Sequence, residues 1–187
     1  DIMDSLGLEY TEEIGEAAFY GPKLDVNVQP AVGNEITLST CQLDFCLPAK
    51  FNLYYIDKDG EKKTPVVLHR AILGSLDRFM AYILEETKGN LPTWLAPVQT
   101  RVMPVKTDDE ALNAYAKEVY DTLMENDIRV ELDDRAEKLG YRMRDGQIQK
   151  VPYLLVIGMN EKDNKTVTFR LHGEQETTTL PLDEFVE

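Results

Sequence analysis

The pattern of apolar and polar residues has a different period in the two halves of the chain. In the first half, alternation with a period of two predicts antiparallel strands over residues 17–28, 35–45, 52–56 and 64–71. Turn signals separate them, Gly33-Asn34 after Pro30 and the hairpin sequence Asp57-Lys58-Asp59-Gly60. The first half is therefore expected to form an antiparallel sheet.

The sheet is followed by one helix. Residues 75–88 have apolar side chains at helical spacing, namely Leu76, Phe79, Met80, Ile83 and Leu84. Gly89 follows at the position of a C-terminal capping glycine. The segment 89–97, with Pro92 and Pro97, is expected to be a connection.

Beyond this connection strands and helices alternate. Strands are predicted over residues 100–105, 128–132, 152–157 and 167–171, and helices over 108–126, 136–149 and 182–187. Such alternation is typical of a small α/β domain with a largely parallel sheet. We therefore expect two domains, residues 1–96 and 97–187, with a combined α/β and α+β fold class.

Composition narrows the class of protein. The 187 residues are 43% hydrophobic and 29% charged, as in an ordinary globular chain, and no segment is apolar enough to cross a membrane. Cys41 and Cys46 are five residues apart in one predicted strand segment, so they would lie on opposite faces, and a disulfide between them is not expected. Reduced cysteines and the absence of a leader sequence favour a cytoplasmic protein. A net charge of −14 argues against non-specific coating of nucleic acid but allows a local basic patch.

The segment from Pro65 to Phe79 carries the most chemical information. A β-branched strand ends in His69 and Arg70, a Gly-Ser turn follows, and a helix opens with Asp77-Arg78. Arg78 at this junction could hold a phosphate, and His69 could ligate a metal. His69 could instead be hydrogen-bonded to a neighbour, and Arg78 could form an ion pair with Asp77 or Glu85. The two histidines and two cysteines do not make a complete metal site.

Two further groups could bind a polar ligand. Gly21-Pro22 fixes a bend between Tyr20 and Lys23, which places a phenol and an ammonium on either side of it. Strand alternation puts Thr40, Gln42 and Asp44 on one face. The alternatives are an ordinary β-turn with a solvated lysine, and a polar strand face that simply meets water.

The segment from Arg135 to Lys150 is locally basic in an acidic chain. Arg135, Lys138 and Arg142 recur at intervals of three and four and would form one stripe on the predicted helix. This is the best candidate RNA contact, although a charged helix face also serves solubility.

Taken together, these segments resemble the threonyl-tRNA synthetases, a family of class II aminoacyl-tRNA synthetases. The resemblance rests on residues 18–23, 40–45, 65–79, 92–99, 134–135, 140–144 and 152–156, in that order along the chain. The segment with His69-Arg70-Ala71 and Arg78 resembles motif 3 of the class. Prolyl, glycyl and histidyl enzymes are less similar because they lack this histidine.

The resemblance implies a fold, a reaction and ligands. It implies part of an antiparallel class II catalytic sheet with its motif 3 helix, followed by an anticodon-binding domain. Arg78 and Lys23 would be catalytic, and the threonine and ATP pocket would include Tyr20, Lys23, Thr40, Gln42, Ser75 and Arg78. His69 would be one ligand of a catalytic Zn²⁺, and Mg²⁺ would accompany ATP. The implied anticodon contacts are Arg135, Arg144, Lys150, Glu161 and Arg170.

The sequence departs from the family pattern at four places: Asp77 stands for a glutamate, Ile36-Thr37 for Trp-Gln, Ala136 for an asparagine and Lys150 for an arginine. Class II motifs 1 and 2 and an editing domain are not found. We therefore expect part of a cytoplasmic threonine–tRNA ligase that acts on threonine, ATP and tRNA(Thr), whose full-length parent is a homodimer, and which is inactive alone. The alternative is a non-catalytic RNA-binding or regulatory module descended from such an enzyme.

Overall fold

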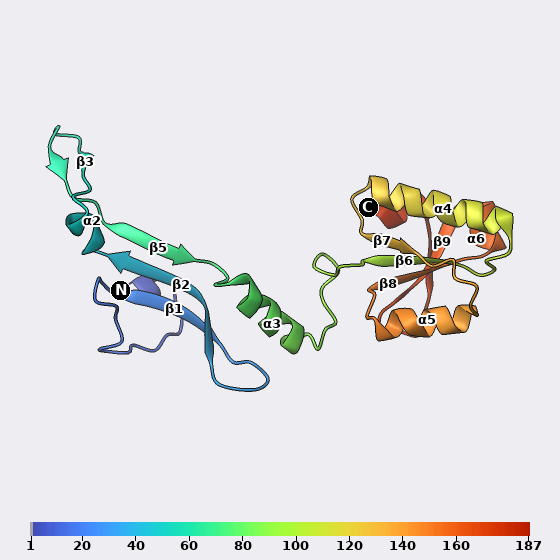
Figure 1. Cartoon of the computed structure of the whole chain (residues 1–187), viewed down its shortest axis with the longest axis horizontal. Helices are drawn as coiled ribbons and strands as arrows, with labels where there is room; N and C mark the ends of the chain where they lie inside the picture. Colours follow the sequence, from blue (N-terminus) through green and yellow to red (C-terminus); the bar gives the residue numbers. More distant parts are fainter. Residues whose placement is uncertain (1) are drawn as a thin grey trace. The chain divides into compact units, whose positions relative to one another are not determined.

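A computed structural model describes residues 2–187, and these residues form two compact units, 2–86 and 87–187. Within the described residues no helix is both long and apolar enough to span a membrane. Each unit has its own sheets (Figure 1). The two units are described separately below.

The first unit contains a three-stranded antiparallel sheet in the order β1-β2-β5. Its elements are α1 (Ile2–Ser5), β1 (Lys23–Val28), β2 (Ile36–Asp44), α2 (Leu47–Lys50), β3 (Tyr55–Ile56), β4 (Lys62–Lys63), β5 (Val67–Ala71) and α3 (Leu76–Glu86). The pair β3–β4 forms a separate hairpin around Asp57 to Gly60. The antiparallel sheet followed by a helix is confirmed.

Three predicted strands of this unit are too long, and the one expected over residues 52–56 is only Tyr55–Ile56 (β3). The first was expected from residue 17, but β1 begins at Lys23, because Gly21 N–H bonds to the Ala18 carbonyl in a tight turn. The fourth was expected from residue 64, but β5 begins at Val67 and pairs with β2, while Lys62 and Lys63 close the hairpin. A hairpin signal fixes a turn, but it does not fix how far the following strand stays with the same partner.

The second unit has a five-stranded sheet in the order β10-β9-β8-β6-β7. Its elements are β6 (Thr100–Pro104), α4 (Glu110–Glu125), β7 (Val130–Leu132), α5 (Leu139–Ile148), β8 (Tyr153–Ile157), α6 (Met159–Asn164), β9 (Thr166–Leu171), β10 (Thr178–Pro181) and α7 (Leu182–Val186). The expectation of a largely parallel sheet is wrong in part. β6 is parallel to β7 and β8, but β9 is antiparallel to β8, and β10 is antiparallel to β9.

Helices cover both faces of this sheet. α4 and α5 lie on opposite sides (Figure 1). The core under α4 is fully buried and consists of Val102, Tyr115, Ala116, Val119, Leu123, Leu155, Ile157 and Val167. A smaller cluster of Met103, Val151 and Leu154 lies on the α5 side, where Gly146 lets the helix approach Leu154 closely. The second unit therefore contains most of the buried apolar surface of the chain.

Candidate functional site

A polar face extends across the three strands of the first unit. Gln42 on β2 is opposite Lys23 on β1 and His69 on β5, and Thr40 is opposite Asp25. Residues that are directly opposite in an antiparallel sheet project from the same face, as do alternate residues of one strand. The polar face therefore consists of Lys23, Asp25, Thr40, Gln42, Asp44 and His69.

Tyr20 joins the polar face from the turn before β1. Its hydroxyl makes a short hydrogen bond to Gln42 Oε1, and its ring centroid is 5.7 Å from that of His69. The turn requires glycine at position 21, because φ there is +154° and a Cβ would be 2.2 Å from the Leu43 carbonyl oxygen. The structure thus brings Tyr20, Gln42 and His69 together, although the first and last are far apart in sequence.

Asp25 links Lys23 to Thr40. Its two carboxylate oxygens each accept a bond of 2.7 Å, one from Lys23 Nζ and one from Thr40 Oγ1. The hydrogen bond from Lys23 lowers the pKa of Asp25, and the same bond raises the pKa of Lys23. Sequence reasoning missed Asp25 as a site residue, although its alternation with Lys23 was a usable signal.

Asp44 is fully buried at the end of β2 and holds His69. Its Oδ1 accepts the backbone N–H groups of Cys46 and Leu47, each at 2.9 Å, and its Oδ2 is 2.8 Å from His69 Nε2. Burial raises the pKa of Asp44, but the bonds from His69 and from the two amides outweigh it, so the pKa is lowered. Since an ionised carboxylate only accepts, His69 Nε2 is the donor and Nδ1 remains for another partner.

This geometry allows His69 to be a metal ligand. Ligating histidines commonly donate their second ring N–H to a carboxylate, as His69 does to Asp44. No cluster of three His, Cys, Asp or Glu residues suited to a metal occurs within residues 2–187. His69 can therefore supply one ligand but not a site.

Arg78 and Ser75 lie at the start of α3. The Ser75 hydroxyl is 3.4 Å from the Arg78 backbone N–H, at the first turn of the helix. Arg78 is exposed, and its guanidinium donates to the Thr37 carbonyl at 3.2 Å. The expected alternative, an ion pair with Asp77 or Glu85, does not occur among the described residues. Gly74 before this helix has φ +67° and lies against the Leu38 carbonyl.

The expected basic stripe of the second unit does not form. α5 begins at Leu139, so Arg135 and Lys138 precede the helix, and Arg142 is fully buried. The Arg142 guanidinium donates to the carbonyls of Asp133 at 2.6 Å, Pro104 at 2.7 Å and Glu137 at 3.2 Å. Arg142 therefore joins three backbone segments, which is a structural role.

Arg135 is held by two carboxylates. Asp133 accepts its Nε and Nη2 at 2.8 and 2.7 Å, and Asp145 accepts its Nη2 at 2.8 Å. Asp145 also binds Arg101, a buried arginine that is paired with Glu131. Arg135 is therefore fixed in place, and much of its charge is already compensated.

The four other predicted RNA contacts occupy different environments. Arg144 is exposed, whereas the Lys150 ammonium bonds to the Lys88 carbonyl. Glu161 caps α6 through the Gly158 N–H at 2.9 Å and also accepts the Thr168 hydroxyl at 2.7 Å. Arg170 on β9 is partly buried. The assignment of these four residues as tRNA contacts stays a prediction.

We expect acid to destabilise the second unit through Asp133 and Asp145. The hydrogen bond from Arg135 lowers the pKa of Asp145 below the ordinary 3.8 of an aspartate. At Asp133 burial raises the pKa, but the hydrogen bonds from Arg135 outweigh burial, so the pKa is lowered. The native state then binds fewer protons than the unfolded state in acid, so stability is present above pH 4 and falls as the pH drops below about 4. Urea unfolding between pH 5 and pH 2.5 measures this loss.

The matched variant is Asp145→Asn, which should unfold more easily at pH 7 but lose less stability on acidification. Asp121→Asn removes an exposed carboxylate that pairs with Lys117 and should keep the native pH dependence. If the stability of the native chain and of Asp145→Asn had the same pH dependence, Asp145 would not be a source of the loss of stability in acid.

Comparison with known proteins identifies both units. Residues 1–87 match the family model of the tRNA synthetase class II core domain (G, H, P, S and T), and residues 99–187 match the anticodon binding domain. The whole chain is 54% identical to threonine–tRNA ligase of Staphylococcus saprophyticus and 52% identical to threonine–tRNA ligase 1 of Bacillus subtilis. It spans 28% and 29% of the lengths of these relatives.

Solved structures agree with this comparison. The RNA binding domain of threonyl-tRNA synthetase from Cryptosporidium parvum is 38% identical with a TM-score of 0.89, over 98% of this chain and 46% of that one. A putative threonyl-tRNA synthetase from Aeropyrum pernix is 32% identical with a TM-score of 0.73, over 96% and 41%. Prolyl-tRNA synthetase of Cryptosporidium parvum shares the fold at 19% identity.

The two family-model matches together place the chain in the class II aminoacyl-tRNA synthetases, as a segment of the core domain followed by an anticodon-binding domain. Within this class the chain belongs to the threonine–tRNA ligase family, because all of this chain matches members of that family.

Proposed function

We propose that the chain is part of an enzyme that activates threonine with ATP and then transfers it to tRNA(Thr). In the first step a carboxylate oxygen of threonine attacks the α-phosphorus of ATP and pyrophosphate leaves. In the second, a ribose hydroxyl at the tRNA 3′ end attacks the carbonyl of the threonyl adenylate and AMP leaves. The observation that carries the proposal is the polar face joined by Tyr20, in the segment that matches the class II core.

The cations of the first unit would bind the nucleotide. Arg78 is exposed, keeps its charge at every physiological pH and has the planar fork that suits phosphate oxygens. Lys23 is an ammonium fixed by Asp25 at the edge of the polar face. Tyr20, Thr40, Gln42 and Ser75 would contribute hydroxyl and amide groups to the adenylate pocket, and Mg²⁺ would accompany the ATP phosphates.

His69 would hold Zn²⁺ through Nδ1, because Nε2 is bound to Asp44. A bound Zn²⁺ would supply a Lewis acid for the amino and hydroxyl groups of threonine. The role of Asp44 is to orient the imidazole and to keep Nε2 protonated. The remaining zinc ligands would come from outside residues 2–187.

The second unit would recognise tRNA. Arg144 is the best placed of the proposed contacts because it is exposed on α5. The further proposed contacts are Arg135, Lys150, Glu161 and Arg170. Three of them, Arg135, Lys150 and Glu161, already have hydrogen-bond partners within the unit, which they would have to exchange or share with the RNA. The parent enzyme would act in the cytoplasm as a homodimer.

Binding to two tRNAs tests this function. The chain should prefer tRNA(Thr) to tRNA(Pro), and binding should weaken as salt rises from 50 to 200 mM, because phosphate contacts release counterions. Arg144→Ala should weaken binding about tenfold if it makes one specific contact. Asp121→Ala, on the exposed face of α4, is the control.

Equal affinity for the two tRNAs, unchanged in Arg144→Ala, would contradict recognition by this unit. It would leave the non-catalytic RNA-binding module as the better description. Fluorescence anisotropy with labelled tRNA measures both affinities.

A further inference from the structure

Residues 87–98, the linking segment, precede β6 and are folded onto the second unit. The Pro92 carbonyl accepts the N–H groups of Leu95 at 2.9 Å and of Ala96 at 3.0 Å, which closes a turn. Ala96 is buried, and Val98 packs against the smaller apolar cluster on the α5 side. The linking segment therefore has a defined conformation and is not a flexible coil.

Arg129, the residue before β7, binds one end of the linking segment. Its guanidinium donates from Nε to the Ala96 carbonyl at 2.9 Å and from Nη2 to the Trp94 carbonyl at 2.7 Å. Its backbone N–H donates to Gln99 Oε1 at 2.9 Å, and its carbonyl accepts the Gln99 N–H at 2.8 Å. The carbonyls of an irregular segment need donors from elsewhere in the chain, and a planar guanidinium can reach two of them at once.

Lys150, which follows α5, binds the other end. Its ammonium donates to the Lys88 carbonyl. Lys88 and Gly89 have φ angles of +53° and +76°, and the Asn90 N–H bonds to the Thr87 carbonyl at 3.0 Å, so the backbone turns there. A cation of the second unit therefore holds each end of the linking segment.

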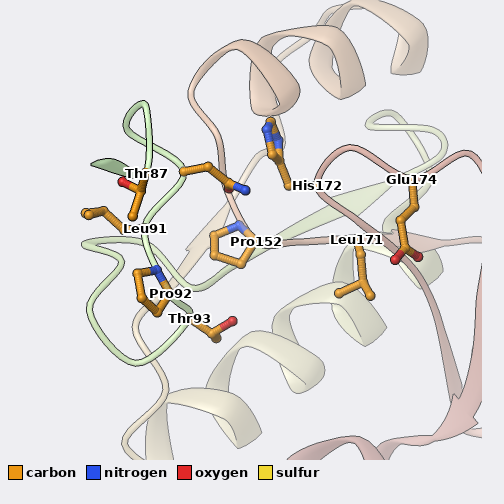
Figure 2. Close-up of a pocket in the computed structure, with 9 residues that line it drawn as sticks. Thr87, Leu91, Pro92, Thr93, Pro152, Leu171, His172 and Glu174 are labelled. Carbon is orange, nitrogen blue, oxygen red and sulfur yellow. The ribbon is translucent and has the colours of Figure 1, made fainter. Parts of the chain in front are cut away.

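Between these ends the linking segment is loosely packed. Cavities of about 340 and 200 Å³ adjoin it, and Leu91 lines both of them. Figure 2 shows the lining of the larger cavity, with Leu91 and Pro92 of the linking segment on one side and His172 on the other. Protein interiors contain few voids larger than a water molecule. The position of the linking segment therefore depends strongly on its contacts with Arg129 and Lys150.

The linking segment continues directly from α3, the helix that carries the proposed ATP contact. α3 spans Leu76–Glu86, and Arg78 lies in its first turn. In the proposed function one tRNA molecule is recognised by the second unit and reacts at its 3′ end in the catalytic core. Two sites that are joined by a fixed segment bind such a ligand better than two sites joined by a mobile one, because the segment is already ordered before binding.

We propose that Arg129 is a positioning residue for the transfer of threonine to tRNA. It holds the linking segment on the second unit, so that recognition of tRNA by this unit is coupled to reaction at the tRNA 3′ end. The proposal rests on the proposed function, and it gives Arg129 no contact with RNA, ATP or threonine. Lys150 is the second anchor, but it is also a proposed tRNA contact, so the test changes Arg129 alone.

The test is Arg129→Met in the parent enzyme, which keeps an aliphatic side chain and removes the guanidinium. The kcat/KM for tRNA(Thr) in the charging reaction should fall about 10- to 100-fold, the effect of misplacing a reacting group by a small distance. Threonine-dependent pyrophosphate exchange should be unchanged, because this step needs no tRNA. The affinity of the 187-residue chain for an anticodon stem-loop RNA should also be unchanged.

Amide hydrogen exchange shows whether the linking segment has been released. The amides of Leu95 and Ala96 should exchange faster in Arg129→Met, whereas those of β8 should exchange as in the native chain. Arg129→Lys should give an intermediate loss of charging, because an ammonium lacks the fork that spans two carbonyls. Lys117→Met is the control, since it removes an exposed cation that pairs with Asp121, and it should behave as the native protein in every measurement.

The outcomes separate the two proposals. Native charging by Arg129→Met, or unchanged exchange of the Leu95 and Ala96 amides, would overturn the positioning role. An equal loss of stem-loop affinity would make Arg129 an RNA contact, and an equal loss of pyrophosphate exchange would make it a support of the core; either result would overturn the proposal. If Arg129→Met does not fold, the same measurements on Arg129→Lys decide. Absence of charging by the native parent enzyme would instead overturn the proposed function.

Discussion

Replacement of Arg142 by methionine should destabilise the second unit by about 3–5 kcal/mol, because three carbonyls lose their donor and each buried group left unsatisfied costs about 1–3 kcal/mol. Methionine keeps most of the volume but leaves the carbonyls of Pro104, Asp133 and Glu137 without their donor. These carbonyls belong to the end of β6, the residue after β7 and the approach to α5. Arg142 therefore joins three segments, and its loss should loosen all of them. Urea unfolding followed by far-UV circular dichroism measures the change in unfolding free energy.

The neighbouring residue provides the control. Arg144→Met, at an exposed position of the same helix, should change the unfolding free energy by less than about 0.5 kcal/mol. Arg142→Lys should be intermediate, because an ammonium cannot span three carbonyls as a guanidinium does. A loss below about 1 kcal/mol for Arg142→Met would show that the contacts are replaced by water.

The second large effect concerns catalysis. The isolated chain should show no threonine-dependent exchange of pyrophosphate into ATP above background. Within residues 2–187 the polar face carries Lys23 and His69 against Asp25 and Asp44, so it has little net positive charge for a triphosphate. Phosphoryl chemistry depends on cations positioned around the transferred group. Arg78 alone does not meet this requirement.

Radioactive pyrophosphate exchange measures the activity, with intact threonine–tRNA ligase 1 of Bacillus subtilis as the positive control. The matched variant is that enzyme with the residue corresponding to Arg78 replaced by alanine, which should lose about 10²–10³ in kcat/KM if the arginine stabilises transition-state charge. Exchange by the isolated chain that depends on Arg78 would contradict the prediction.

The two units differ in how their sheets are covered. In the first unit, the face opposite the polar face carries large apolar side chains that are 37–57% exposed, namely Leu24, Val26, Leu43, Phe45 and Leu68. In the second unit, α4 packs on one face of the sheet and covers a cluster of fully buried apolar residues. The second unit should therefore contribute most of the cooperative unfolding signal, since buried apolar area dominates stability.

Local sequence was sufficient for much of the fold. The helical spacing of Leu112, Tyr115, Ala116, Val119 and Leu123 predicts α4 within two residues at its start, where Asp109 caps it. Alternation over residues 35–45 predicts β2 and its polar face almost to the residue. These elements could be predicted because each contains its own apolar face and its own end signals.

Tertiary structure decided the rest. The sequence places Lys23, Gln42 and His69 on three strands, but only the register of the sheet sets them side by side. It places Arg142 on a charged helix, but only packing against β6 and the Asp133 loop buries it. The polar residue types at the site and the helix and strand periods were thus determined by the sequence itself. Contacts between residues distant in the chain decided which charges are exposed on the polar face and which bind backbone carbonyls. The reason is that burial and pairing are properties of the assembled sheet and not of a local pattern.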